Sequence, residues 1–218
     1  MSDTTTNTGS DIMIPIKEYY YALIEGNKEK RYIGRTDQPL FEEGIVGIKE
    51  NLGRYPSVEK VYASPMKRTR QTAELIYPGQ ASELVDGLRE MDMGVFEGKN
   101  HAELKNRPSY ILWVATRGKI SIPGGESMKD FGKRTMDAFT QVLGDMQAEG
   151  IKRSAVVAHG GTIMSIVSQL ADDDYYKYMV NNGAGFRLTL DDDGKLLDLN
   201  PLLKEDNCMR DALEELED

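Results

Sequence analysis

Three residues in this chain have the side-chain types needed to bind and protonate an oxyanion. His159 follows a short β-prone run at 154–158 and is followed by Gly160 and Gly161. The two glycines allow the backbone to approach a ligand closely, and the N–H groups of a helix that begins there attract an anion. Arg68 lies one turn into another expected helix, where its guanidinium can form two hydrogen bonds to a phosphate group. These residues therefore indicate phosphate chemistry.

Glu90 is the third residue of this kind and the candidate proton donor. It lies between the apolar residues Leu88 and Met91, and a carboxyl with apolar neighbours can keep its proton and act as a general acid. Each candidate also has a plain structural interpretation. His159 alone fits a hydrogen-bonded histidine at a strand end, Arg68 a solvated member of a basic cluster, and Glu90 an ordinary loop glutamate. Their combination favours the functional interpretation for His159 and Arg68.

A further string of polar residues follows an expected first strand. It contains Asn27, Arg31, Tyr32 and Gly34. Arg31 is a candidate ligand for a phosphate or a substrate carboxylate, while the alternative is turn chemistry with a surface charge. His101 is the only histidine in the chain other than His159; it precedes a short expected helix and is interpreted as a surface or capping residue.

The elements that must position these residues alternate between strands and helices. This alternation predicts an α/β fold: three layers, with a mostly parallel sheet flanked by helices on both faces. The candidates then meet at the carboxyl ends of the strands, where such sheets bind ligands. Ser64 is expected to cap a helix that starts at Pro65. The expected strands are 19–24, 58–63, 154–158 and a hairpin of 186–190 with 196–199; the expected helices are 40–52, 64–76, 101–106, 110–116, 128–147 and 161–170.

Composition limits the class of protein. The 218 residues suffice for one domain, and a net charge of −9 argues against nucleic acid or an anionic membrane as a partner. The single cysteine, Cys208, allows no intrachain disulfide and favours a reducing compartment. Neither a membrane-spanning run nor a signal peptide is present, which favours the cytoplasm. We expect a disordered tail at 1–16, one domain at 17–203 and an acidic tail at 204–218.

Taken together, four segments resemble the histidine phosphatase superfamily, in its phosphoglycerate-mutase-like branch. They are Asn27 with Arg31-Tyr32 and Gly34; Ser64-Pro65 with Arg68 and Gln71-Thr72-Ala73; Glu90 with Gly94 and Glu97-Gly98; and His159-Gly160. Residues 123–127, Pro-Gly-Gly-Glu-Ser, most resemble the α-ribazole phosphatase-like members.

The resemblance implies a phosphatase for a small phosphorylated metabolite, with no metal and no cofactor. It implies that Arg68 and Asn27 contact phosphate, that Glu90 protonates the leaving group, and that His159 is the second histidine of the pocket. Gly34, Arg31 and Gly160 complete the candidate binding set.

One segment departs from this pattern. The family's first strand ends in Arg-His-Gly, whose histidine is the nucleophile, shortly before the asparagine. Here Ile24 leads directly into Glu25-Gly26-Asn27, so about five residues are missing and the nucleophile is absent. Three hypotheses remain open: a phosphatase whose catalysis is impaired, a non-catalytic binding or interaction module, and a five-residue deletion in an otherwise active enzyme.

Overall fold

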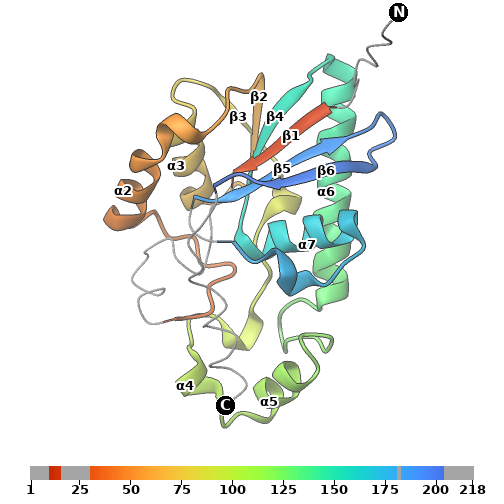
Figure 1. The fold of residues 1–218 in the computed structure, drawn as a ribbon. Helices are drawn as coiled ribbons and strands as arrows, with labels where there is room; N and C mark the ends of the chain where they lie inside the picture. Colours follow the sequence, from red (N-terminus) through yellow and green to blue (C-terminus); the bar gives the residue numbers. More distant parts are fainter. Residues whose placement is uncertain (1–9, 16–29, 181–182, 204–218) are drawn as a thin grey trace, which may run out of the picture.

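The computed structural model describes residues 10–15, 30–180 and 183–203. Its strands form one six-stranded sheet in the order β3-β2-β4-β1-β5-β6 (Figure 1). The strands are β1 Ser10–Pro15, β2 Lys60–Ala63, β3 Ser82–Leu84, β4 Arg153–Val157, β5 Gly185–Leu190 and β6 Leu196–Pro201.

The sheet is parallel on one side and antiparallel on the other. β2 pairs in parallel with β3 and β4, and β4 pairs in parallel with β1. β5 then runs antiparallel to both β1 and β6. A tight turn around Asp191 and Gly194 joins β5 to β6, which confirms the predicted hairpin. The predicted mostly parallel α/β sheet is therefore present.

Helices cover both faces of the sheet. Figure 1 shows α2 (Glu42–Glu50) and α3 (Lys67–Ile76) on one side, and α6 (Met128–Glu149) and α7 (Gly160–Ala171) on the other. The long helix α6 is amphipathic, and it ends at Gly150, whose φ of 70° is the left-handed conformation that glycine adopts without strain. This arrangement is the predicted three-layer fold.

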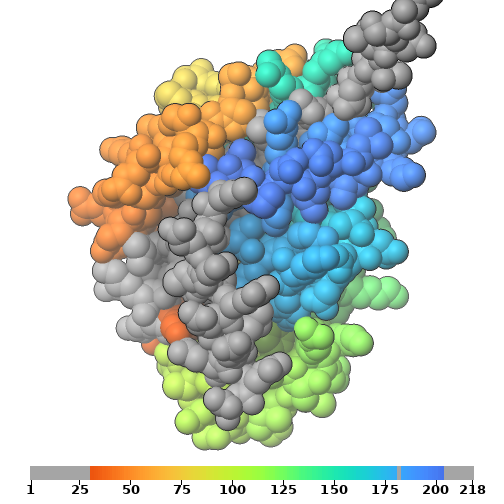
Figure 2. Space-filling view, in the orientation of Figure 1, coloured from red at the N-terminus to blue at the C-terminus, as the bar shows by residue number. Residues whose placement is uncertain are grey.

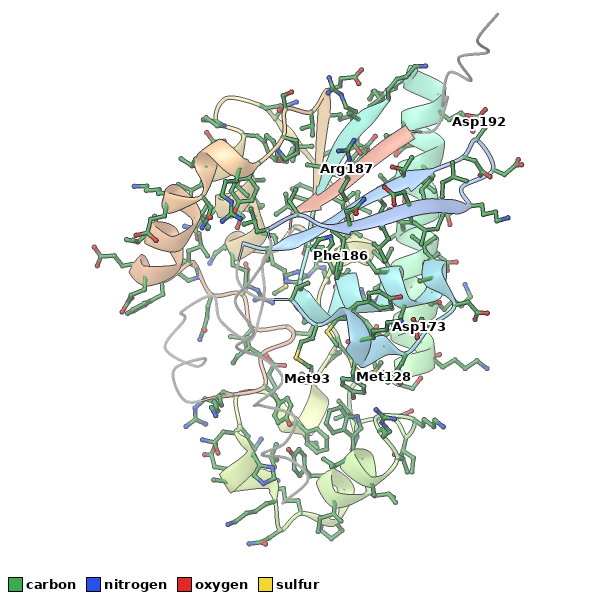
Figure 3. All side chains as sticks on the ribbon, viewed as in Figure 1. Met93, Met128, Asp173, Phe186, Arg187 and Asp192 are labelled. Carbon is green, nitrogen blue, oxygen red and sulfur yellow. The ribbon has the colours of Figure 1, made fainter. Side chains whose placement is uncertain are left out.

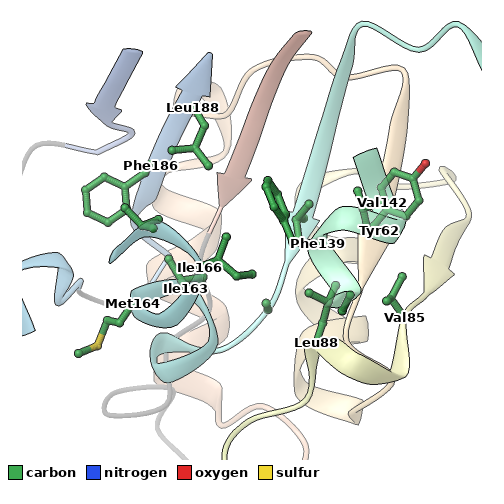
Figure 4. Packing of buried hydrophobic residues seen from close by; sticks show 14 of the residues in the cluster. Tyr62, Val85, Leu88, Phe139, Val142, Ile163, Met164, Ile166, Phe186 and Leu188 are labelled. Atoms are coloured by element: carbon green, nitrogen blue, oxygen red, sulfur yellow. The ribbon is translucent and has the colours of Figure 1, made fainter. Parts of the chain in front are cut away.

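Successive side chains of β4 point to opposite faces of the sheet and therefore belong to two different core clusters. Val156 packs with α6 and α7, in a cluster that includes Phe139 and Ile163 (Figure 4). The neighbouring residues Ala155 and Val157 pack on the opposite face, with α2 and α3. A strand buried on both faces reads as a continuous apolar run, which is why this strand was predictable from the sequence.

A third cluster lies away from the sheet, in the segment between β3 and α6. It contains the short helices α4 (His101–Leu104) and α5 (Pro108–Ala115), packed around Phe96, Tyr110 and Trp113. Met93 and Met128, labelled in Figure 3, pack against the same cluster. Asn100 caps α4 through a reciprocal capping box with Glu103. His101 itself is exposed, as expected.

The single-turn 3-10 helices complete the described elements. They are η1 Leu52–Arg54, η2 Asp86–Leu88, η3 Gly94–Phe96 and η4 Tyr175–Tyr178. No helix in the described part of the chain combines the length and hydropathy required to cross a bilayer. Figure 2 shows one face of the molecule as a space-filling view. The atoms of α2 and α3 are orange, those of β5 and β6 are blue, and those of α4 and α5 are green.

The N-terminal region differs from what the sequence predicts. The expected disordered tail at 1–16 is wrong for Ser10–Pro15, which forms β1 between β4 and β5. The Ile-Met-Ile sequence in this stretch has strong β-propensity, and the two neighbouring strands offer backbone groups for pairing. The strand expected at 19–24 lies outside the described residues, as does Asn27.

Candidate phosphate site at the carboxyl ends of two strands

The site begins where β2 and β4 end side by side. Ala63 pairs with Val157 in this parallel ladder, so the residues that follow each strand come together. His159 Nε2 lies 2.7 Å from Ser64 Oγ, and both side chains are fully buried. The structure therefore places a hydroxyl–imidazole pair at the predicted edge of the sheet.

The expected role of Ser64 as a helix cap is wrong. Helix α3 begins at Lys67 rather than at Pro65, and its N-cap residue is Met66, whose side chain caps nothing. The Lys67 N–H instead donates to Asp37 Oδ1 over 2.7 Å. Because an aspartate from another segment satisfies the helix terminus, the Ser64 hydroxyl is available to His159.

Arg68 is fully buried on the first turn of α3. Its Nη2 donates to the Gly34 carbonyl over 2.9 Å, and its Nη1 donates to the Thr36 carbonyl. Burial lowers the pKa of the guanidinium to about 9, against the opposing effect of the Glu90 and Glu97 charges, so the group stays protonated at neutral pH. The structure thus supplies a desolvated cation on the helix that follows Ser64.

Gly34 contributes to the site through its backbone. A Cβ at this position would lie 2.0 Å from the Met91 carbonyl oxygen, so only glycine allows this approach. The Glu97 carboxylate accepts hydrogen bonds from the Gly34 N–H and from both the N–H and the hydroxyl of Thr36. Glu97 therefore fixes the loop whose carbonyls hold Arg68, a role that its place in the sequence did not reveal.

Glu90 is also buried, with 3% of its surface exposed. Its Oε1 accepts from the Met91 N–H over 2.8 Å, and its Oε2 accepts from the Gly161 N–H over 3.0 Å. Burial raises the pKa of this carboxyl, although these two N–H groups and then the charge of Arg68 act in the opposite direction. A buried carboxyl with a raised pKa is suited to carry a proton.

The glycines after His159 explain how Glu90 reaches its position. His159 precedes α7, whose first residues are Gly160 and Gly161. A Cβ on Gly161 would lie only 2.4 Å from Glu90 Oε1. The sequence predicts that a ligand can approach the backbone closely at these glycines. In the structure the group that does so is the Glu90 carboxylate. It lies at the N-terminus of α7, where negative charge is favoured.

The described hydrogen bonds of Arg31 are with residues other than Arg68, Glu90 and His159. Its Nη1 donates to the Gly98 carbonyl and to Glu103 Oε2, each over 2.6 Å, and its backbone forms a bridge to Asn100. These contacts attach Arg31 to the start of α4. Its expected contact with a phosphate or carboxylate stays a prediction.

The described side chains of this site do not form a metal centre. Among the residues that the structure describes, no group of three or more His, Cys, Asp or Glu side chains is arranged to hold a metal ion. The acidic and basic groups of the site are used in hydrogen bonds instead.

The chain is similar to known proteins over most of its length. The family model of the histidine phosphatase superfamily (branch 1) matches residues 22–200. A metal-independent phosphoserine phosphatase from Arabidopsis thaliana is 32% identical over 151 residues, which cover 64% of this chain and 61% of that protein. Adenosylcobalamin/alpha-ribazole phosphatase from Salmonella typhimurium is 27% identical over 158 residues, covering 67% and 74%.

Two solved structures show the same fold. The alpha-ribazole phosphatase from Shigella flexneri superimposes with a TM-score of 0.74 at 19% identity, covering 90% of this chain and 100% of that one. A phosphoglycerate mutase from Thermus thermophilus gives a TM-score of 0.63 at 27% identity, covering 90% and 99%. Because the Shigella flexneri protein is only 19% identical, its similarity to this chain concerns the fold alone.

Proposed function

The chain belongs to the histidine phosphatase superfamily (branch 1), and from this premise we propose that its site binds small phosphomonoesters but hydrolyses them poorly. One observation carries the proposal. Arg68, Glu90 and His159 are all buried, and Glu90 is bonded to the Gly161 N–H next to His159-Gly160 and lies near enough to Arg68 for its charge to affect the Arg68 pKa. The sequence from Ile24 to Asn27, in contrast, contains no histidine. We infer that Arg68 supplies a cation and Glu90 a proton to this site, and that the family's nucleophile is missing from it.

Each retained group has a part in binding. Arg68 is a fixed cation for the phosphate dianion, and charge-assisted hydrogen bonds from such a group are the strong ones. Protonated Glu90 would face the ester oxygen, and the His159 imidazole would contact a phosphate oxygen. The substrates in the names of the relatives, phosphoserine and α-ribazole phosphate, place the ligand among small phosphomonoesters. Metal independence and a cytoplasmic location belong to the same proposal.

The missing histidine explains why turnover should be low. In this family the histidine nitrogen attacks phosphorus, and water then hydrolyses the phosphohistidine. Removing the nucleophile from a covalent mechanism costs on the order of a million-fold in rate, as in a serine protease. Uncatalysed phosphomonoester hydrolysis is itself among the slowest reactions known.

Turnover and binding are measured separately to test this. We expect hydrolysis of p-nitrophenyl phosphate and α-ribazole phosphate close to background, together with calorimetric binding of inorganic phosphate. Arg68→Lys keeps the charge and loses the planar fork, and should weaken phosphate binding by about ten- to a hundredfold, which corresponds to about 1.4–2.8 kcal/mol.

Arg70→Lys, an exposed position on the same helix, is the matched control and should bind as the natural chain does. Turnover equal to that of an ordinary family member would show that catalysis is intact. Absence of phosphate binding would remove the binding function.

A second candidate function is a binding or interaction module with no catalytic role. The observation that favours it is the buried, hydrogen-bonded state of Glu90 and His159 in a chain without the nucleophile. Intact-mass measurement of the protein from its own cells addresses the remaining alternative, because an active form with the five residues restored would be heavier by their mass.

A further inference from the structure

An ion pair outside the phosphate site holds the loop that carries Glu90. Arg134 on α6 donates from Nε to Glu126 Oε1 and from Nη2 to Glu126 Oε2, each over 2.7 Å. The two side chains are 22% and 16% exposed, so solvent reaches them only in part. A two-bond pair of this kind fixes geometry as well as charge.

The remaining donors of Arg134 all bind backbone carbonyls of residues 87–92, which we call the Glu90 loop. Nη1 donates to the carbonyls of Gly87 and Arg89 over 2.8 and 2.9 Å, and Nη2 donates to the carbonyl of Glu90 over 3.2 Å. A guanidinium has five N–H groups, and all five of Arg134 are therefore engaged. Three of them bind backbone carbonyls within the four residues 87–90.

Glu126 holds the same loop from its other end. Its Oε2 accepts from the Asp92 N–H over 2.8 Å, and its own N–H donates to the Asp92 carbonyl over 3.0 Å. Burial alone would raise the pKa of Glu126, but the hydrogen bonds from Arg134 and the Asp92 N–H outweigh it and lower that pKa. Glu126 thus stays ionised and keeps Arg134 in place.

The backbone of residues 87–92 is therefore fixed on both sides of Glu90. The Thr162 hydroxyl adds a bond to the Arg89 carbonyl over 3.1 Å, which ties the loop to α7 as well. The Glu90 carboxyl extends from this loop to the Gly161 N–H. A shift of the loop by about 1 Å would break that contact, because hydrogen bonds weaken steeply outside their normal range.

We propose that Glu126 and Arg134 are positioning residues for Glu90. They fix its carboxyl on the Gly161 N–H and thereby set where a proton is presented to the phosphate site. This inference rests on the proposed function, since it assigns a purpose to the proton that Glu90 carries. It concerns the geometry of Glu90, which is measurable without any ligand.

Amide NMR on the full chain tests the proposal. The Gly161 N–H donates directly to Glu90, so its proton shift should follow the ionisation of Glu90 as pH is varied. Arg134→Lys keeps the positive charge but cannot form the fork or reach three carbonyls. We expect the pH-dependent shift of the Gly161 amide to be lost in Arg134→Lys and reduced in Glu126→Gln.

The neighbouring Lys133→Met is the matched control. Lys133 is an exposed residue of the same helix that pairs with Asp137, and its loss should leave the Gly161 titration unchanged. If Arg134→Lys and Glu126→Gln melt at lower temperature but keep the Gly161 titration of the natural chain, the ion pair has only a structural role and the inference is overturned. Should Arg134→Lys fail to fold, the isosteric Glu126→Gln decides by the same readout.

This result is independent of the phosphate measurements. A chain that binds no phosphate would defeat the proposed function and leave the Gly161 titration in place. An unchanged titration in the variants would defeat the positioning role and leave phosphate affinity in place.

Discussion

Ser64 Oγ and His159 Nε2 lie 2.7 Å apart, although the two residues are 95 positions apart in the chain. Each follows a strand, and the two strands are parallel neighbours in the sheet. The pair is fully buried, so neither group can exchange its partner for bulk water. This contact orients the imidazole of His159, which we propose as a ligand of the phosphate.

Ser64→Ala should destabilise the fold by about 1–3 kcal/mol, because a buried imidazole nitrogen loses its partner. Urea unfolding of the variant and of the natural chain measures the difference. Ser57→Ala, at an exposed serine before β2, is the control and should change stability by less than about 0.5 kcal/mol. An equal, small effect in both variants would mean that the Ser64 contact contributes nothing.

Glu90 should make stability fall as pH rises. Its folded pKa is raised by burial, so the unfolded chain loses this proton first, near pH 4.3, while the folded chain keeps it. Between the two pKa values stability declines by about 1.4 kcal/mol per pH unit from this group, and above the folded pKa the loss is complete.

Glu90→Gln removes this titration and provides the comparison. The stability of the natural chain relative to Glu90→Gln should decrease as the pH rises above about 4.5 in urea unfolding experiments. A relative stability that increases with pH would show that the hydrogen bonds from Met91 and Gly161 outweigh desolvation.

Gly161 and Gly144 form a matched pair of helical glycines. A Cβ on Gly161 would collide with Glu90 Oε1, so Gly161→Ala should destabilise by about 1–3 kcal/mol through overpacking. A Cβ on Gly144 in α6 would meet no atom within 4 Å, so Gly144→Ala should stabilise by about 0.5–1 kcal/mol. Thermal unfolding of both variants checks the opposite signs, and a stabilising Gly161→Ala would contradict the close approach of Glu90.

Restoring the missing segment should restore catalysis. Inserting Arg-His-Gly-Lys-Thr between Ile24 and Glu25 supplies the family nucleophile, and Arg68, Glu90 and His159 are retained to complete the site. We expect turnover of p-nitrophenyl phosphate and an acid-labile phosphoenzyme after exposure to a labelled phosphodonor.

The control insertion is Arg-Ala-Gly-Lys-Thr, which restores the length of the segment without the nucleophile and should remain inactive. A folded histidine-containing variant with neither phosphoenzyme nor turnover would show that the site has lost more than this segment. The binding-module hypothesis would then be favoured.

The sequence by itself was enough for the fold class and for most of the elements. Buried strands such as β4 are continuous apolar runs, and helices such as α6 show a clear apolar stripe, so local pattern specifies both. The glycines after His159 and the fork-forming Arg68 also identified one edge of the sheet. These features are visible because they depend on neighbours in the chain.

Tertiary structure decided which polar groups meet. The Ser64–His159 pair, the Glu97 bonds to Gly34 and the Arg134 bonds to the Glu90 loop join segments that are distant in the chain. Ser64 has a local interpretation as a helix cap, and only the fold shows that Asp37 takes that role. Long-range hydrogen bonds leave no periodic pattern in a sequence, because their partners are brought together by strand pairing and helix packing.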